Sequence, residues 1–217
     1  MQRFWRAAIL ALTLLSMAPG RRAAADVVYS SYTLPFSQNV TLNVPNAVDN
    51  ERGAAGQIWL HAGLGITKAW CIDIFHMLQG AGTLIAGTLN TAQAAKISAL
   101  ASHGDALLAT SPTDTVSAAI QVAIWKVATG SGLTVSGNAT MLALADSYTN
   151  NVNTGFWAAD PGKALVVLAP LPGMSNQTLV TMVDVPEPAA AGLFAAGLGG
   201  LVLLRRRQAA RSRGNSV

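Results

Sequence analysis

The sequence contains very little cysteine and very little charge. One cysteine occurs in 217 residues, and only 11% of the residues are charged. A single cysteine cannot form an intramolecular disulfide, so a disulfide-stapled scaffold is excluded. The sequence also has no internal repeat and no low-complexity tract, which excludes a repeat architecture. About half of the residues are apolar (51%), which is enough for one domain with a core of its own.

Basic residues are scarce between Asp26 and Val185. That stretch holds five lysines and arginines against nine acidic residues, a net charge of −4, although the whole chain carries +4. The positive charge therefore lies at the two ends of the chain. A surface that binds nucleic acid needs clustered Lys and Arg, so the sequence predicts no nucleic-acid partner.

The familiar patterns of catalytic and metal-binding residues are also missing. The three histidines, His61, His76 and His103, are scattered and form no metal-ligand set. No Ser-His-Asp order, glycine-rich phosphate loop or close carboxylate pair occurs. We therefore predict a protein that is not an enzyme and that carries no metal or cofactor. Asp73 and His76 lie near the cysteine in sequence, as proton carriers or as structural residues.

Residues 1–25 have the pattern of a secretory signal peptide. Arg3 and Arg6 precede an apolar run over residues 7–18, and three alanines at 23–25 provide a cleavage pattern before Asp26. The run is shorter than the ~20 residues that span a bilayer, which favours a signal peptide over a spanning anchor. We therefore predict export through the Sec translocon.

Residues 185–217 have the pattern of a membrane anchor. Pro186-Glu187-Pro188 precedes sixteen uncharged, mostly apolar residues at 189–204, and three arginines follow at 205–207. As a helix the apolar run would be ~24 Å long, just enough to anchor in a hydrocarbon core of ~30 Å. The positive-inside rule keeps the arginines and the basic tail at 208–217 in the cytoplasm and the body in the periplasm. A buried core helix, the alternative, seldom ends in three arginines.

The order of these parts resembles the PEP-CTERM sorting signal of Gram-negative bacteria, over residues 185–207. The resemblance implies recognition by an exosortase, a membrane transpeptidase-like enzyme that cuts near Pro186-Glu187-Pro188. The protein would then be held in the inner membrane first, and released or re-attached outside it afterwards.

Residues 26–184 are predicted to form one globular body. Short alternating stretches predict strands as far as residue 75: VVYSSYTLPF, NVTLNV, QIWLHA and TKAWCIDIF. Helical patterns follow at 90–104, between Ser111 and Gly130, and at 139–149, and strands return at 163–169 and 177–183. In the second helix, Ser111 is expected as the cap and Pro112 as the first helical residue. Gly80, Gly82 and Gly87 are expected in turns. This order predicts an α+β fold, an antiparallel sheet or sandwich with a helical insertion.

Two residues of the body call for an explanation. Cys71 lies on a predicted core strand, where it is a buried inert thiol, half of an intermolecular bridge, or a reactive group. Gln121 lies on the second helix, ~100° from the centre of its apolar face at Ile120, at the boundary of the core. Trp125 follows one turn later.

The segments around these residues, Trp70-Cys71-Ile72-Asp73 and Gln121-Val122-Ala123-Ile124-Trp125, resemble the bacterial thioester domain of surface adhesins. That family has an aromatic-Cys-aliphatic strand and a later helix with Gln-x-Ala-aliphatic-Trp. Trp70 replaces the more usual tyrosine, and Ile120 stands where threonine is common. The resemblance implies an internal thioester between Cys71 and Gln121, with loss of ammonia, that bonds once to an amine or hydroxyl group of a partner.

Several residues are candidates to protect or support such a bond. Aromatic side chains near the motifs exclude water in this interpretation, as well as packing in the core: Trp59, Trp70, Phe75 and Trp125. Asp73 is a further supporting candidate. The first hypothesis is therefore a surface-displayed adhesion protein that attaches covalently. The alternative is a noncovalent structural protein of the extracellular polysaccharide matrix, with Cys71 as a core thiol and Gln121 as a boundary residue that bonds to backbone.

Overall fold

The computed structural model describes residues 26–45, 47–63 and 65–185, which belong to one unit, Arg22–Val185. The predicted signal peptide, the Pro-Glu-Pro motif and the apolar segment after it lie outside these residues. Among the described residues, no helix is both long and apolar enough to cross a membrane.

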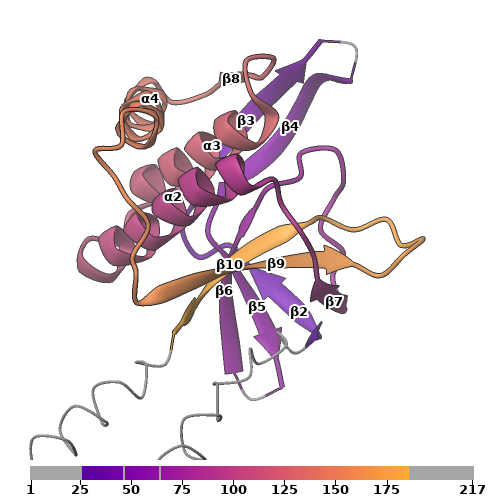
Figure 1. Cartoon of the computed structure of the whole chain (residues 1–217). Coiled ribbons are helices and arrows are strands. Elements are labelled where there is room, and N and C mark those ends of the chain that lie inside the picture. The colour runs from indigo at the N-terminus through magenta and orange to yellow at the C-terminus, as the bar shows by residue number, and fades with distance from the viewer. Residues whose placement is uncertain (1–25, 46, 64, 186–217) are drawn as a thin grey trace, which may run out of the picture. The chain divides into compact units, whose positions relative to one another are not determined.

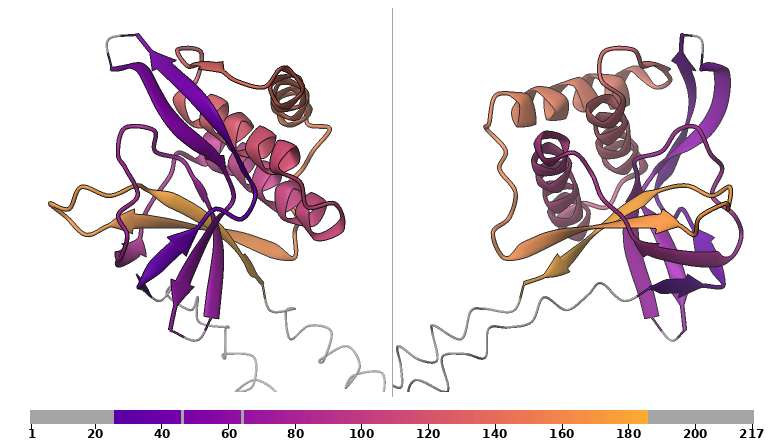
Figure 2. Two further views of the ribbon diagram at one scale, coloured as in Figure 1. Left: turned by 180° about the vertical axis from the view of Figure 1, so that it is seen from behind. Right: turned by 45° about the vertical axis from the view of Figure 1, so that its right-hand side comes forward.

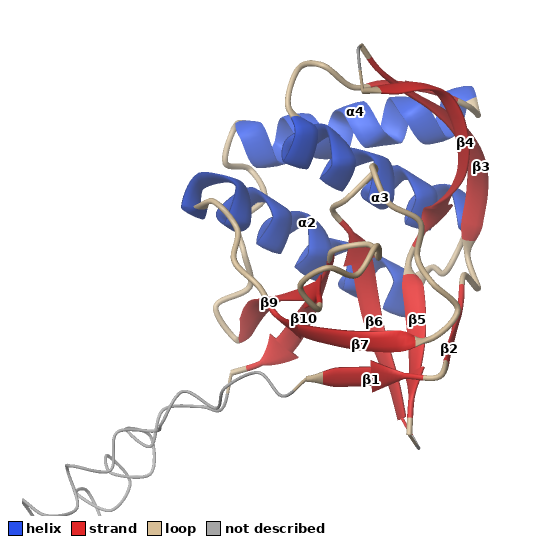
Figure 3. Cartoon of the chain, turned by 90° about the vertical axis from the view of Figure 1, so that its right-hand side faces the viewer, coloured by secondary structure: helices blue, strands red, loops and turns tan. Residues whose placement is uncertain are grey.

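The larger sheet has seven strands, and all of its pairs are antiparallel (Figure 3). The strands are β1 (Val27–Tyr29), β2 (Ser31–Thr33), β5 (Ile58–Ala62), β6 (Gly65–Cys71), β7 (Gly82–Ala86), β9 (Lys163–Pro170) and β10 (Leu179–Asp184). Their order is β1-β7-β9-β10-β6-β5-β2. The two edge strands β1 and β2 are separated in sequence by Ser30 alone, so one bent segment pairs with β7 and with β5. This segment closes the sheet on itself.

A second sheet of three strands has the order β4-β3-β8, with β3 at Ser37–Val44, β4 at Val48–Gly56 and β8 at Thr134–Ser136. The β3–β4 hairpin extends away from the larger sheet and lies along one of the helices (Figures 1 and 2). It therefore covers a helix face that the larger sheet does not reach.

Three helices separate β7 from β9: α2 (Thr91–Thr110), α3 (Asp114–Thr129) and α4 (Ala139–Asn153). Each helix has an N-cap residue whose side chain accepts a hydrogen bond from a backbone N–H of the first turn. The N-cap residues are Asn90, Thr113 and Asn138, respectively. Helix α3 packs against α2, α4, the β3–β4 hairpin and β6. Every residue from 117 to 125 is buried as a result. This helix is the centre of the fold.

The structure confirms the predicted α+β fold with a helical insertion in a mostly antiparallel arrangement. Several local expectations are wrong. Helix α2 does not end at Gly104 but continues to Thr110, because this glycine serves close packing: a Cβ there would lie 2.8 Å from Ile120 Cγ2 and 3.0 Å from Trp70 Cζ2. Pro112 precedes the helix cap at Thr113 and is not the first helical residue.

Two differences concern strands. Gly82 belongs to β7, not to a turn, and a Cβ there would lie 3.2 Å from Asn176 Nδ2. The sequence of β4, VDNERGAAG, has no alternating apolar pattern and was not expected to form a strand. It forms one because β3 supplies its hydrogen bonds along its length.

Candidate functional site

Cys71 and Gln121, fifty positions apart in sequence, are joined by two hydrogen bonds. Cys71 is the last residue of β6, and Gln121 lies in the middle of α3. The Cys71 N–H donates to Gln121 Oε1 at 3.0 Å, and Gln121 Nε2 donates to the Cys71 carbonyl at 2.7 Å. The side-chain amide of Gln121 therefore lies against residue 71 as a neighbouring strand would.

Both residues are buried, and only Gln121 is more deeply buried than the sequence indicated. Cys71 is 2% exposed and Gln121 is 1% exposed, whereas Gln121 was expected at the boundary of the core. The expectation is wrong because the β3–β4 hairpin covers α3 from the side opposite α2 and α4. A buried amide must find partners for its oxygen and its NH₂ group, and the backbone of Cys71 supplies both.

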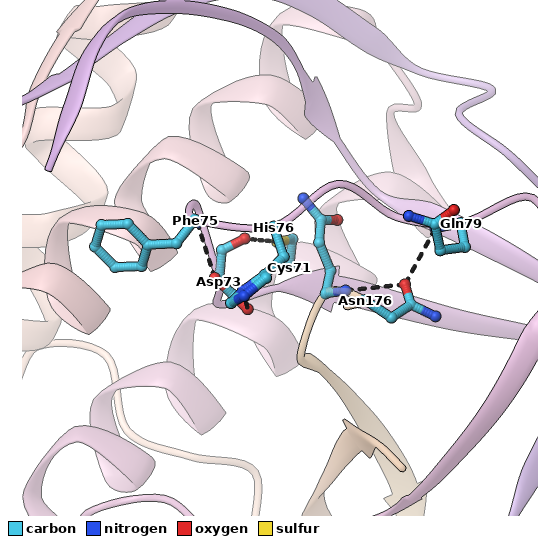
Figure 4. Close-up of polar contacts among 7 residues, drawn as sticks. Cys71, Asp73, Phe75, His76, Gln79 and Asn176 are labelled. Atoms are coloured by element: carbon cyan, nitrogen blue, oxygen red, sulfur yellow. Dashed lines mark hydrogen bonds and ion pairs between the residues drawn. The ribbon is translucent and has the colours of Figure 1, made fainter. Parts of the chain in front are cut away.

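The Cys71 sulfur is buried and lies beside mostly apolar side chains. Its S–H donates to the Asp73 carbonyl at 2.9 Å (Figure 4). Burial raises the pKa of the thiol to about 12, while the nearby Trp125 side chain and the Asp73 backbone partly oppose this rise. The Trp125 indole N–H is buried and makes no hydrogen bond of ordinary geometry within the described part of the chain. It acts on the sulfur as a nearby donor, not as a formed hydrogen bond.

A pocket of about 170 Å³ borders Cys71, Gln121 and Trp125. Most of its wall is apolar and comes from β2, β3, β5 and the segment after β6: Tyr32, Leu34, Leu42, Ile58, Ile74, Met77 and Leu78. Glu51, Arg52, His76 and Gln177 add polar groups. A larger pocket of about 500 Å³ lies beside α2, α3 and α4, and it shares no residue with this one. The smaller pocket is therefore the one that gives access to the Cys71–Gln121 pair.

The segment after β6 folds back on Asp73. One carboxylate oxygen of Asp73 accepts the Phe75 N–H at 2.8 Å, and the other lies 2.7 Å from His76 Nδ1 (Figure 4). The His76 side chain is 49% exposed and lines the same pocket as Cys71. The sequence offered Asp73 and His76 as proton carriers or structural residues, and the fold brings the pair beside the cysteine.

The four aromatic side chains expected to shield the thioester lie in different parts of the structure. Trp125 alone among them lines the pocket. Trp70 is buried, but its indole donates to Asp105 Oδ1 at 3.2 Å and faces α2. Trp59 donates to Gln57 Oε1 at 2.9 Å, and Phe75 is 55% exposed. Trp70 therefore supports β6 against the helices and does not cover the sulfur.

A buried polar cluster that sequence reasoning missed lies behind β6. Gln57 Nε2 donates to Asp105 Oδ1 at 2.7 Å, and the Gln57 backbone N–H donates to Ser117 Oγ at 2.8 Å. Burial raises the pKa of Asp105, while the Trp70 hydrogen bond opposes the rise. The cluster ties β5 and β6 to α2 and α3, which fixes the strand that carries Cys71. Nothing in the local sequence around Gln57 or Asp105 indicates this pairing.

A second missed group holds the two loops beside the pocket. Asn176 is buried, and its Oδ1 accepts the N–H groups of Gln79 and Gln177 (Figure 4). Its Nδ2 donates to Tyr29 Oη at 2.9 Å. Tyr29 Oη in turn donates to the Gln79 carbonyl at 3.0 Å. The loop after β6 is thereby fixed to the loop before β10.

The described residues contain no group of three or more His, Cys, Asp or Glu side chains that could hold a metal ion. The PEP-CTERM protein-sorting motif matches residues 184–208. The chain is an exported, surface-sorted protein. An exosortase is its processing partner, and the motif includes Pro186-Glu187-Pro188 as the sequence predicted. No curated protein and no solved structure matches the chain.

Proposed function

We propose that this surface-sorted protein forms an internal thioester between Cys71 and Gln121. It would use the bond once, to attach covalently to an amine or hydroxyl group of a surface or matrix partner. The observation that carries the proposal is the pair of hydrogen bonds between the Gln121 side-chain amide and the Cys71 backbone. They hold an amide carbonyl carbon beside the residue that carries the only sulfhydryl group of the chain.

Bond formation would proceed by attack of Cys71 Sγ on Gln121 Cδ. The sulfur leaves the Asp73 carbonyl, the Sγ–Cδ bond forms and the Cδ–Nε2 bond breaks. The thiol proton departs on the amide nitrogen, so ammonia is the product. The Cys71 N–H already donates to Gln121 Oε1 at 3.0 Å, and it would stabilise negative charge on that oxygen in the tetrahedral intermediate.

Two opposing effects decide whether this reaction is feasible. The rise of the thiol pKa from 9.0 to about 12 lowers the ionised fraction at pH 7 by about 10³-fold. Holding a nucleophile and an electrophile together supplies effective concentrations of about 10⁵–10⁸ M. Proximity would therefore offset the loss of thiolate that burial causes. Burial also keeps water away from the product.

Opening of the bond would release the Cys71 thiolate in exchange for an attached partner. Trp125 supports this step because its buried N–H has no other partner among the described residues and lies near the sulfur. An incoming amine or hydroxyl reaches the bond through the pocket that Cys71, Gln121 and Trp125 line.

Trapping with methylamine tests the proposal at the level of peptides. Cleavage after Lys68, Lys96 and Lys126 gives one peptide with Cys71 (69–96) and one with Gln121 (97–126). Protein incubated with methylamine should carry N-methylation at Gln121 and release one free thiol at Cys71. Gln57, which is equally buried, serves as an internal control and should stay unmodified.

The Cys71→Ala variant should show no methylamine incorporation under the same conditions. Incorporation at Gln121 in that variant would mean that a reaction other than thioester opening modifies the amide. An unmodified Gln121 beside a free Cys71 thiol in the wild type would contradict the proposal. That result would leave the noncovalent matrix protein as the remaining interpretation.

A further inference from the structure

His76 is held in one tautomer next to the proposed bond. A carboxylate only accepts hydrogen bonds, so the 2.7 Å contact with Asp73 Oδ2 places a proton on His76 Nδ1. The lone pair of the neutral ring is then on Nε2, which makes no hydrogen bond within the part of the chain that the structure describes. His76 lines the same pocket as Cys71 and Gln121, and Figure 4 shows it beside Cys71.

A base at this position changes which acceptors can react. A neutral amine attacks a thioester with its own lone pair. A hydroxyl group is a weak nucleophile unless its proton is removed as the new bond forms, and a positioned base contributes about 10²–10⁴-fold to such a step. The structure therefore contains a group that a hydroxyl acceptor needs and an amine acceptor does not.

The charge of the pocket agrees with a neutral acceptor. A protonated amine would need an available carboxylate to bind, but Asp73 already accepts from Phe75 and His76. Glu51 and Arg52 of the same wall carry opposite charges, so together they give it no net charge. The remaining wall is mostly apolar.

We propose that His76 is the general base for transfer of the Gln121 acyl group to hydroxyl groups, with Asp73 as its positioning residue. The inference rests on the proposed thioester. The acceptor O–H proton moves to His76 Nε2 as its oxygen bonds to Gln121 Cδ. The Cδ–Sγ bond breaks, and the proton then passes from Nε2 to the leaving Cys71 sulfur. An ester at position 121 and a free thiol are the products.

The same base would also act on water. Hydrolysis converts the acyl group at position 121 to glutamate and frees the Cys71 thiol. Replacement of His76 should therefore slow ester formation and hydrolysis together, while aminolysis is largely retained. A side chain with only a structural role would not separate these reactions.

The experiment measures the reaction of the full-length chain, purified in detergent, with glycerol and with methylamine. The proteins compared are the wild type, His76→Gln, Asp73→Asn and a control, His61→Gln, whose histidine bonds to Thr33 and does not line the pocket. The peptide of residues 97–126 reports each product by mass. The fraction of thioester present before addition is measured for every protein, so a variant that has lost the bond or the fold is recognised.

We expect glycerol ester formation to fall by about 100-fold or more in His76→Gln, and methylamine rates to stay within about threefold. Asp73→Asn should behave similarly, because an amide N–H facing Nδ1 favours the opposite tautomer and leaves no lone pair on Nε2. His61→Gln should match the wild type.

Three results would overturn the inference. Equal rates of glycerol ester formation in the wild type and in His76→Gln would show that His76 is not the base. The proposed thioester would still stand. Reaction of the wild type with methylamine but not with glycerol would exclude hydroxyl acceptors. Absence of any thioester in freshly purified wild type would overturn both this inference and the proposed function.

Discussion

At the scale of single residues, Cys71 combines a buried sulfur with a backbone that bonds to a side chain. Strand β6 pairs with β5 only as far as Ala69, and the N–H and C=O groups of Cys71 bond to Gln121 instead. The Gln121 amide therefore takes the place of a β5 residue beside Cys71. A side chain that replaces a strand must sit at a fixed distance from the backbone that it bonds, so this glutamine is held beside Cys71.

The free Cys71 thiol should make stability depend on alkaline pH. Its pKa is raised to about 12 in the folded protein from an ordinary 9.0. Above pH ~9 the unfolded chain loses the thiol proton while the folded chain keeps it, so the unfolded state binds fewer protons and the free energy of unfolding falls with rising pH. The buried thiol makes its full contribution to the free energy of unfolding below pH ~9, and this contribution is lost as the pH approaches about 12.

Urea unfolding of methylamine-opened protein at several values between pH ~8 and ~11 measures this effect. The Cys71→Ala variant corrects for the titration of lysines and tyrosines. The two proteins should diverge as pH rises, with the thiol protein losing more stability. Parallel curves would show that the thiol is not buried as the structure describes.

At the scale of elements, the site depends on how closely α2, α3 and β6 approach one another. Gly104 of α2 faces Ile120 of α3 and Trp70 of β6, and these two residues immediately precede Gln121 and Cys71 in sequence. The contact that sets the spacing of the three elements is therefore one residue away from each proposed reacting group. The buried cluster of Gln57, Asp105 and Ser117 lies next to this contact, because the Trp70 indole donates to Asp105 and Asp105 follows Gly104 on α2.

Replacement of Gly104 with alanine tests this spacing. Alanine favours a helix interior over glycine by about 1 kcal/mol, but the added Cβ would lie 2.8 Å from Ile120 Cγ2. Overpacking of this kind costs about 1–3 kcal/mol, so we expect Gly104→Ala to lower the unfolding free energy on balance. It should also slow thioester formation, because α3 and β6 are displaced.

Gly132→Ala is the matched control, since no heavy atom lies within 4 Å of a Cβ there. Its stability by urea unfolding and its thioester content should equal those of the wild type. A stabilised Gly104→Ala protein with normal thioester content would show that the close approach is not a constraint on the site.

At the scale of the whole molecule, the sequence predicted the fold class and the two motifs but not their surroundings. Helical and strand periodicity is local, so the strands around β3, β5 and β6 and the three helices were recognisable. The burial of Gln121 was not, because it depends on a hairpin whose second strand, β4, has no apolar alternation. The pocket wall draws residues such as Leu42 and Gln177 from distant segments, and no local pattern joins them.

The sorting motif makes a prediction about the entire chain. If residues 184–208 direct processing, deletion of the exosortase should leave the C-terminal segment on the protein and hold it in the inner membrane. Size by electrophoresis and distribution between membrane and surface fractions measure this. The Pro186→Ala, Glu187→Ala, Pro188→Ala triple variant in the normal strain should behave like the deletion. Unchanged size and location in both strains would contradict processing at this motif.

Orientation in the membrane is tested separately by a reporter fused after Val217. The arginines at 205–207 should keep that reporter in the cytoplasm of cells without exosortase, with the body in the periplasm. A periplasmic signal from the reporter would reverse the proposed topology.

The intact mass of freshly purified protein shows whether Cys71 and Gln121 are bonded to each other. With both termini assigned by peptide mapping, the wild type should be lighter than its sequence by one ammonia. The Cys71→Ala protein should have its sequence mass. Spontaneous hydrolysis before measurement would be recognised by glutamate at position 121 beside a free thiol. A wild-type mass equal to the sequence mass, with glutamine intact at position 121 and Cys71 free, would contradict the account.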